Sequence, residues 1–395
     1  MKNKIQTLSE SVFSYVCDAY KHLHVHPELS FQEKETASYI QQQLTALNIP
    51  FRANIGGTGI LGILEGKNPK KKIVALRADM DALPIEEETN LSYKSKVPHC
   101  MHACGHDSHV ANLLGVAKVL SEIKNDLEGT VLFVFQPGEE RHPGGARLML
   151  QDGVFDEYKP DVVIGQHASV DYPMGTVAFR AGQIMASADE IHLTVKGKGG
   201  HGALPHLFND TVLCASQILV SLQQIRARLN NPFSPMVLSF GKFIADGSTN
   251  IIPDEVKLSG TLRTLDEAWR KECKEHIRRI VTETAIAYGC TCDIELSDGY
   301  PSVNNDAEIT ANAIVYAEEI VGKEYVKELE VRMTGEDFSF FSQQYPSTFY
   351  RFGIKGKTNT TTGNLHTSTF QIDLDVFKTS VSVMAWLTSR YLNSK

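Results

Sequence analysis

GTVLFVFQPGEE, residues 129–140, is a short apolar run that ends at a Pro-Gly pair followed by two glutamates. KKIVALRADM (71–80) and DVVIGQHA (161–168) have the same form, in which an apolar stretch ends in polar residues. Buried parallel strands have this pattern. The intervening SHVANLLGVAKVLSEI (108–123) has helical periodicity. Alternating strands and helices predict an α/β fold, with a mainly parallel central sheet flanked by helices.

Residues 184–298 follow another pattern and are expected to form an inserted domain. Strands are predicted at 187–197, 236–246, 254–265 and 292–299, and amphipathic helices at 209–229 and 266–289. Their order is βαββαβ, the split pattern of a small ferredoxin-like domain with an antiparallel sheet. Residues 1–183 and 299–395 are then expected to form a single domain that the insertion interrupts.

Composition narrows the class of protein. The 395 residues, 42% hydrophobic and 22% charged, are typical of a globular chain with two domains. A net charge of −8 argues against a nucleic-acid-binding surface. No apolar stretch approaches the length of a membrane span, and the N-terminus lacks the apolar segment of a signal peptide. The seven cysteines indicate no disulfide framework, so we expect a cytoplasmic protein with reduced thiols.

Polar side chains collect where the predicted strands end. Asp79 ends the first strand, Glu139 and Glu140 follow the second, and His167 ends the third. HACGHDSH (102–109) leads into the helix that follows it. Ligands of open α/β sheets bind outside the carboxyl ends of the strands. These clusters therefore predict one functional site along this edge of the sheet.

The residue types at this edge suit a transition metal. Cys104 and His106 offer a thiolate and an imidazole, His167 a second imidazole, and Glu139 and Glu140 two carboxylates. This combination is typical of zinc or another first-row divalent ion. A hydrolytic metal site needs both a ligand and a base that takes a proton from the attacking water. One carboxylate of the pair can serve each need.

Other interpretations of the same residues stay open at this point. Taken singly, each side chain is more often a solvated loop group, and an exposed Glu139–Glu140 pair costs little. Cys104 could instead be a nucleophile activated by a neighbouring histidine, although no separate oriented base is evident and the glutamates would have no role. GGTG (56–59) lacks the full GxGxxG pattern and is interpreted as a turn.

Eight motifs, in order along nearly the whole chain, resemble those of the M20 metallopeptidase and amidohydrolase family. The similarity is to its aminoacylase-like branch, with hippurate hydrolases, N-acetyldiaminopimelate deacetylases and auxin-conjugate hydrolases. The motifs are HPELSFQE (26–33), RADMDALPI (77–85), MHACGHD (101–107), QPGEE (136–140), GKGGHGALPH (197–206), NIIPDEVKLSGTLRT (250–264), GEDFSFF (335–341) and LHTSTF (365–370).

The resemblance implies a metal-dependent amidohydrolase that cleaves the amide bond of N-acyl amino acids with metal-activated water. A dipeptidase or carboxypeptidase of the same family is the alternative. A third hypothesis is a non-catalytic binding protein. The presence of Glu139 argues against it, because binding alone does not need a base. The implied general base is Glu139, and one or two Zn, Mn, Co or Ni ions per subunit are expected. The implied metal ligands are Cys104, His106, Glu140, His167 and His366.

The resemblance also assigns roles outside the metal ligands. His201 and Asn250 match positions that help to stabilise the oxyanion of the tetrahedral intermediate. Arg263 is either a partner for a substrate carboxylate or a surface charge on a strand. Many two-metal relatives carry His-x-Asp where this chain has Arg77-Ala78-Asp79, so Asp79 is expected to orient a ligand instead.

The inserted domain is expected to act as a lid or dimerisation domain. In some relatives the lid histidine comes from the other subunit, which implies a homodimer. The expected partners are a small N-acyl amino acid or short peptide and a second copy of the chain. Neither a nucleic acid nor a membrane is expected as a partner.

Overall fold

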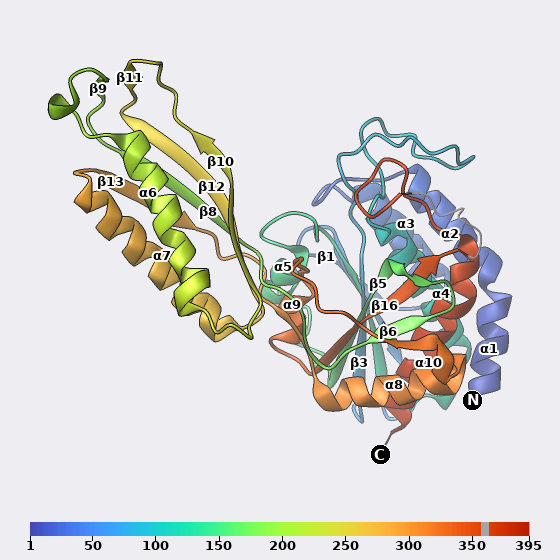
Figure 1. Ribbon diagram of the computed structural model, residues 1–395. Coiled ribbons are helices and arrows are strands. Elements are labelled where there is room, and N and C mark those ends of the chain that lie inside the picture. The colour runs from blue at the N-terminus through green and yellow to red at the C-terminus, as the bar shows by residue number, and fades with distance from the viewer. Residues whose placement is uncertain (357–362, 395) are drawn as a thin grey trace. The chain divides into compact units, whose positions relative to one another are not determined.

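The computed structural model describes residues 1–356 and 363–394 (Figure 1). The chain divides into two compact units. The larger unit comprises Met1–Gly182, Asn304–Glu330 and Asp337–Lys395, and the smaller comprises Gln183–Val303 and Val331–Glu336. The larger unit has the α/β architecture that the sequence predicts, because its central sheet is mostly parallel and is packed against helices.

The sheet of the larger unit has eight strands in the order β1-β2-β4-β3-β5-β16-β6-β15. The four inner strands β4, β3, β5 and β16 run parallel, and β1 and β2 add an antiparallel edge. At the other edge β6 is antiparallel to β16 and parallel to β15. The strands are β1 (Phe51–Ile55), β2 (Gly59–Glu65), β3 (Ile73–Asp79), β4 (Thr130–Gln136), β5 (Val162–Pro173), β6 (Val177–Phe179), β15 (Val326–Glu328) and β16 (Ser347–Lys355).

Helices α4, α8 and α10 pack on this sheet, and α1 and α2 pack on those helices. Short helices α5 and α9 pack against β4 and β16. The helices of this unit are α1 (Lys2–Ser11), α2 (Phe13–Val25), α3 (Lys34–Ala46), α4 (His106–Glu122), α5 (Gly145–Gln151), α8 (Ala307–Val321), α9 (Ser339–Ser342) and α10 (Phe377–Asn393). Single-turn 3-10 helices are η1 (Lys124–Asp126), η4 (Lys323–Tyr325) and η5 (Leu374–Val376).

The position of α4 follows from its sequence and fixes the site. Fourteen residues from His106 to Leu120 are buried, because the helix lies between the sheet and other helices. Gly105 precedes it with a left-handed φ of 86°, which glycine adopts without steric cost. The chain therefore turns sharply between Cys104 and His106 and leaves both side chains at the buried start of the helix.

The smaller unit has the predicted βαββαβ order. Its antiparallel sheet has the strand order β10-β12-β8-β13, and α6 and α7 pack side by side against it (Figure 1). Asp210 and Asp266 cap the two helices by accepting backbone N–H groups. The elements are β8 (Asp189–Lys196), β9 (Gly200–His201), η2 (Pro205–Leu207), α6 (Thr211–Gln224), the π-helix η3 (Ile225–Leu229), β10 (Met236–Ile244), β11 (Ile251–Ile252), β12 (Glu255–Thr264), α7 (Glu267–Ala287) and β13 (Thr291–Leu296).

Two further short strands, β7 (Gly182–Met185) and β14 (Val303–Asn305), lie where the chain passes from one unit to the other. Among the described residues, no helix has both the length and the apolar character that crossing a membrane requires.

Candidate metal centre

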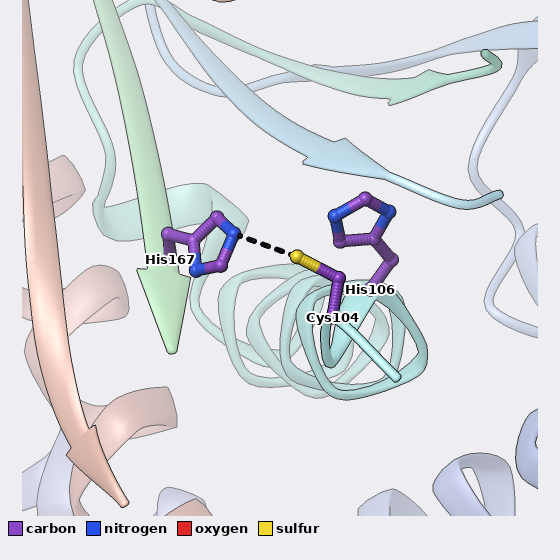
Figure 2. A group of neighbouring side chains, drawn as sticks. All are labelled: Cys104, His106 and His167. Carbon is purple, nitrogen blue, oxygen red and sulfur yellow. Dashed lines mark hydrogen bonds between the residues drawn. The ribbon is translucent and has the colours of Figure 1, made fainter. Parts of the chain in front are cut away.

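The larger unit brings six of the predicted site residues together at the carboxyl edge of its sheet. Glu139 and Glu140 lie in the turn after β4. His167 lies on β5, His106 begins α4, and Cys104 lies two residues before it (Figure 2). The groups whose possible ligand atoms all lie within 4.8 Å of one another include Cys104–His106–His167, Cys104–Glu140–His366 and His106–Glu139–Glu140.

Hydrogen bonds at the outer ring nitrogens fix how the two buried imidazoles are oriented. His106 Nδ1 donates to Asp81, whose backbone oxygen is 3.0 Å away and whose Oδ1 is 3.2 Å away. His167 Nδ1 donates to the Ala168 carbonyl oxygen at 2.7 Å. In the neutral form of each ring the lone pair is therefore on Nε2, as in metal-binding histidines. His167 Nε2 lies 3.4 Å from Cys104 Sγ (Figure 2).

One buried ring nitrogen at this site, His106 Nε2, has no hydrogen-bond partner among the described residues. It lies 4.0 Å from Glu140 Oε1, a carboxylate oxygen that also pairs with His366 Nε2 at 3.1 Å. A buried polar atom without a partner is costly. A divalent cation between His106 Nε2 and Glu140 Oε1 would bind both. The residues present thus fit a divalent metal, by their chemistry and by the unsatisfied His106 nitrogen.

Cys104 is held as a neutral thiol by its surroundings. Burial, and then the negative charge of Glu140, raise the pKa of the Cys104 thiol to about 12. This environment does not favour a free thiolate nucleophile. A coordinated cation reverses this preference, because a thiol bound to such an ion loses its proton. The geometry therefore favours a ligand role for Cys104 over a nucleophilic one.

His366 reaches the site from a loop that follows β16. Its backbone N–H donates to the Ala103 carbonyl oxygen at 2.8 Å, and its φ is 64°. This left-handed backbone is rare for a residue other than glycine and indicates a tightly held loop. His366 Nε2 lies 3.1 Å from Glu140 Oε1, and the hydrogen bond to this carboxylate raises the pKa of the half-exposed imidazole.

Asp79 belongs to a buried charge network beside the site. Its carboxylate lies 2.5 Å from Arg77 Nη1 and also 2.5 Å from His109 Nδ1. Burial alone would raise the pKa of Asp79, but Arg77 and the nearby histidines hold it well below its usual range. Asp337 completes the pairing of Arg77, with Oδ1 2.7 Å from Nη2. Asp79 Oδ2 lies 3.7 Å from His106 Nε2.

His109 and Asp81 have roles that sequence reasoning did not assign. His109 Nε2 accepts the Ala168 N–H at 2.9 Å while Nδ1 donates to Asp79, so neither nitrogen is available to a metal. Asp81 orients His106 through Nδ1 and accepts the Glu140 N–H at 3.0 Å. A signal for Asp81 was present, because it ends the same RADMD stretch as Asp79.

The smaller unit places two predicted oxyanion residues beside each other. His201 is paired in the β9–β11 ladder, and the Gly202 N–H donates to the Asn250 carbonyl oxygen at 2.9 Å. His201 Nδ1 accepts the Ala203 N–H at 3.1 Å, so the proton of the neutral ring is on Nε2 and can be donated. Both side chains are exposed within this unit.

Arg263 lies on β12 of the smaller unit and is half-buried. Its Nε donates to Thr261 Oγ1 at 2.9 Å. Burial lowers the pKa of this guanidinium, although it stays far above neutral in any protein. A desolvated guanidinium of this kind is well suited to a carboxylate, whereas a charge on an open strand face would be fully hydrated.

The sequence and the fold are similar to those of known hydrolases. The N-acyl-L-amino acid amidohydrolase of Geobacillus stearothermophilus is 40% identical over 306 residues, which cover 77% of this chain and 82% of that protein. Thermostable carboxypeptidase 1 of Saccharolobus solfataricus is 37% identical over 396 residues, which cover 100% of this chain and 98% of that protein. The solved structure of Bacillus subtilis YxeP, a dinuclear metal binding peptidase from the M20 family, has a TM-score of 0.84, 32% identity and coverage of 98% and 100%.

A family model matches most of the chain as well. It is described as Peptidase family M20/M25/M40 and matches residues 75–390. This range contains all six residues of the candidate metal centre and the whole smaller unit. The chain therefore belongs to peptidase family M20/M25/M40.

Proposed function

We propose that this protein is a metal-dependent amidohydrolase that cleaves N-acyl amino acids into a carboxylic acid and a free amino acid. The observation that carries the proposal is the set of buried acceptor atoms around Cys104 Sγ. His106 Nε2 lacks a hydrogen-bond partner among the described residues, Glu140 Oε1 lies 4.0 Å from it, and His167 Nε2 lies 3.4 Å from the sulfur. The amidohydrolase relative at 40% identity supports this substrate class.

In this proposal Cys104, His106, Glu140, His167 and His366 would hold one or two divalent ions, with Zn, Mn, Co and Ni as candidates. When bound, such an ion supplies positive charge that stabilises an oxyanion and makes water acidic enough to deprotonate near neutral pH. Asp81 orients the His106 ring by accepting a hydrogen bond from its Nδ1–H, which leaves Nε2 as the nitrogen that can bind the ion. Asp79 orients His109, which in turn accepts the Ala168 N–H beside His167.

Glu139 is the proposed general base. It is buried. Its carboxylate and the possible ligand atoms of Glu140 and His106 all lie within 4.8 Å of one another. We propose that it takes a proton from the attacking water and passes that proton to the leaving amine. Glu140, one residue away, is then free to act as a ligand, because the turn at Gly138 lets adjacent side chains face the same site.

The smaller unit is proposed to act as a lid or dimerisation domain. His201 is proposed to donate from Nε2 to the developing oxyanion, with the Asn250 amide assisting. Arg263 is proposed to bind the carboxylate of the amino-acid product bidentately. In this assignment residues 1–183 and 299–395 form the catalytic domain and residues 184–298 the lid or dimerisation domain.

We further propose a homodimer formed through the smaller unit. Strand β10 lies at the edge of its sheet, where one row of backbone groups is open to pairing. Phe243 and Ile244 on this strand, and Val220 on α6, are exposed apolar side chains. Light scattering on the protein and on Ile244→Asp should show a dimer that the substitution weakens.

The cytoplasmic location inferred from the sequence stays a prediction.

A carboxypeptidase is the second candidate, supported by the Saccharolobus solfataricus relative at 37% identity. Both reactions hydrolyse an amide next to an amino-acid carboxylate, so the same site serves either. Initial rates on acetyl- and benzoyl-amino acids, compared with rates on dipeptides and blocked peptides, separate the two. The proposal expects the higher kcat/KM on N-acyl amino acids.

The role of Glu139 is tested by Glu139→Gln, which removes the base and keeps the shape. We expect turnover to fall by about 10²–10⁴ while bound metal stays at the wild-type level. Glu140→Ala and His167→Ala serve as matched controls, because loss of a ligand should lower metal content together with activity. Full activity in Glu139→Gln would remove Glu139 from this role, and full metal occupancy in both controls would remove them as ligands.

A further inference from the structure

The turn that carries Glu139 and Glu140 is held at both ends by buried carboxylates. At its far end the Glu140 N–H donates to Asp81 Oδ2 at 3.0 Å. At its near end the Gly138 N–H donates to Glu33 Oε1 at 2.9 Å. The two carboxylates come from segments distant in sequence from the turn. The backbone on either side of the proposed base is therefore fixed by side chains rather than by strand pairing.

Glu33 makes further hydrogen bonds that use both of its oxygens. Oε1 also accepts the Phe31 N–H at 2.8 Å, and Oε2 accepts the Thr58 hydroxyl at 2.8 Å. The side chain of Glu33 is fully buried. A buried carboxylate with three donors is strongly held, because each donor offsets part of the hydration that it lost. Glu33 thus joins three segments of the chain at one point.

Packing at Gly138 shows that this arrangement is tight. Gly138 has a left-handed φ of 57°, and a Cβ there would lie 2.3 Å from the Phe31 ring. Phe31 itself has a left-handed φ of 65°, which is strained for an aromatic residue. At this position the Phe31 N–H donates to Glu33 Oε1, and the Phe31 ring packs against Gly138. Such strain persists only where the surroundings fix it.

Two sequence motifs that the metal centre does not use meet at this point. Glu33 and Phe31 belong to HPELSFQE (26–33), and Thr58 belongs to GGTG (56–59). Neither motif contributes a proposed ligand or base. Both contribute to holding the Pro137–Glu140 turn, Glu33 directly and Thr58 through Glu33.

We propose that Glu33 is a positioning residue for the general base, with Thr58 supporting it. By fixing the Gly138 N–H, Glu33 sets the direction in which Glu139 leaves the turn. This inference rests on the proposed role of Glu139 as the base. A displacement of the base by about 1 Å is enough to slow a proton transfer by about 10². Loss of Glu33 should therefore act on kcat, because four of the proposed ligands lie on other elements and Glu140, on the same turn, is still held by Asp81 through its N–H.

The test compares Glu33→Ala, Glu33→Gln and Glu35→Ala in the metal-loaded full-length enzyme, with kcat, KM, metal content and melting temperature measured for each. We expect Glu33→Ala to lower kcat by about 10- to 100-fold, with KM and metal content within about twofold of wild type. Glu33→Gln keeps an oxygen that can accept both N–H groups and should restore most of kcat. Glu35 is the exposed control two residues away, and its removal should leave kcat unchanged.

Thr58→Val provides a milder variant if Glu33→Ala does not fold. It removes one of the three donors and should lower kcat in the same direction but by less. Glu139→Gln, measured alongside, separates the two proposals: if it is active, the role of Glu139 fails. If Glu139→Gln is inactive while Glu33→Ala or Thr58→Val matches Glu35→Ala in kcat, the positioning role of Glu33 is wrong. A fall in metal content that accounts for the lost activity would also overturn it.

Discussion

Buried hydrogen bonds determine which ring nitrogen of each histidine at the site carries the proton. His106 and His167 each donate from Nδ1, so the neutral form of each ring carries its lone pair on Nε2. His109 is only three residues from His106, yet both of its nitrogens are engaged. The tautomer of each ring, rather than the number of histidines, therefore decides which of them can bind a metal.

His24 gives a pH-dependent prediction at this scale. Burial lowers the pKa of His24, but hydrogen bonds to Asp107 at 2.7 Å and Glu87 at 3.3 Å more than compensate and raise it to about 9. Because the ordinary value is about 6.5, the stabilisation is fully present below pH 6.5 and is lost as pH rises through 9. It is on the order of 3 kcal/mol.

Urea unfolding of the wild type and of His24→Gln, each at pH 6 and at pH 9.5, checks this. The wild type should be more stable than the variant at pH 6, and the difference should shrink at pH 9.5. A difference that stays the same at both pH values would show that His24 is neutral in the folded protein.

At the scale of elements, sequence periodicity predicted the strands and helices that build the site, but not how all of them pair. The runs that became β3, β4 and β5 were recognised because their apolar residues are continuous and end in polar ones. The antiparallel edge strands β1 and β2 were not predicted. The helix expected at 209–229 changes to a π-helix at Ile225, because local periodicity cannot distinguish the two.

The same limit applies to the residues of the site. Asp79, Glu139 and His167 were found because each lies at or just after the end of an apolar run that is recognisable as a strand. His366 lies on a loop without periodicity, so only the family resemblance indicated it. The link between His24 and Asp107 spans 83 positions, and no local pattern reports a pairing of that kind. Long-range packing, and not propensity, selects such partners.

Helix α7 offers a prediction at the element scale. The Asp266 side chain caps it by accepting the Trp269 N–H at 3.0 Å. Asp266→Ala should lower the free energy of unfolding of the smaller unit by about 1 kcal/mol. Trp269 fluorescence, in a Trp386→Phe background, reports this transition. Exposed Glu275 on the same helix is the control, since Glu275→Ala should change the unfolding free energy by less than about 0.5 kcal/mol. Equal effects of the two substitutions would contradict the capping role.

At the scale of the whole molecule, the two units divide the proposed work. The larger unit carries all the proposed metal ligands and the base, and the smaller unit carries His201, Asn250 and Arg263. The family and the amidohydrolase relatives support one reaction class, metal-dependent hydrolysis of the amide of an N-acyl amino acid.

The most direct measurement is the release of free amino acid from a panel of acetyl- and benzoyl-amino acids by the purified protein. The protein is first stripped with a chelator and then reconstituted separately with Zn, Mn, Co and Ni. The account predicts that the stripped protein is inactive, that at least one metal restores turnover, and that Glu139→Gln reconstituted in the same way stays inactive. Hydrolysis that is unaffected by removal of metal, or no hydrolysis of any N-acyl amino acid with any of the four metals, would contradict it.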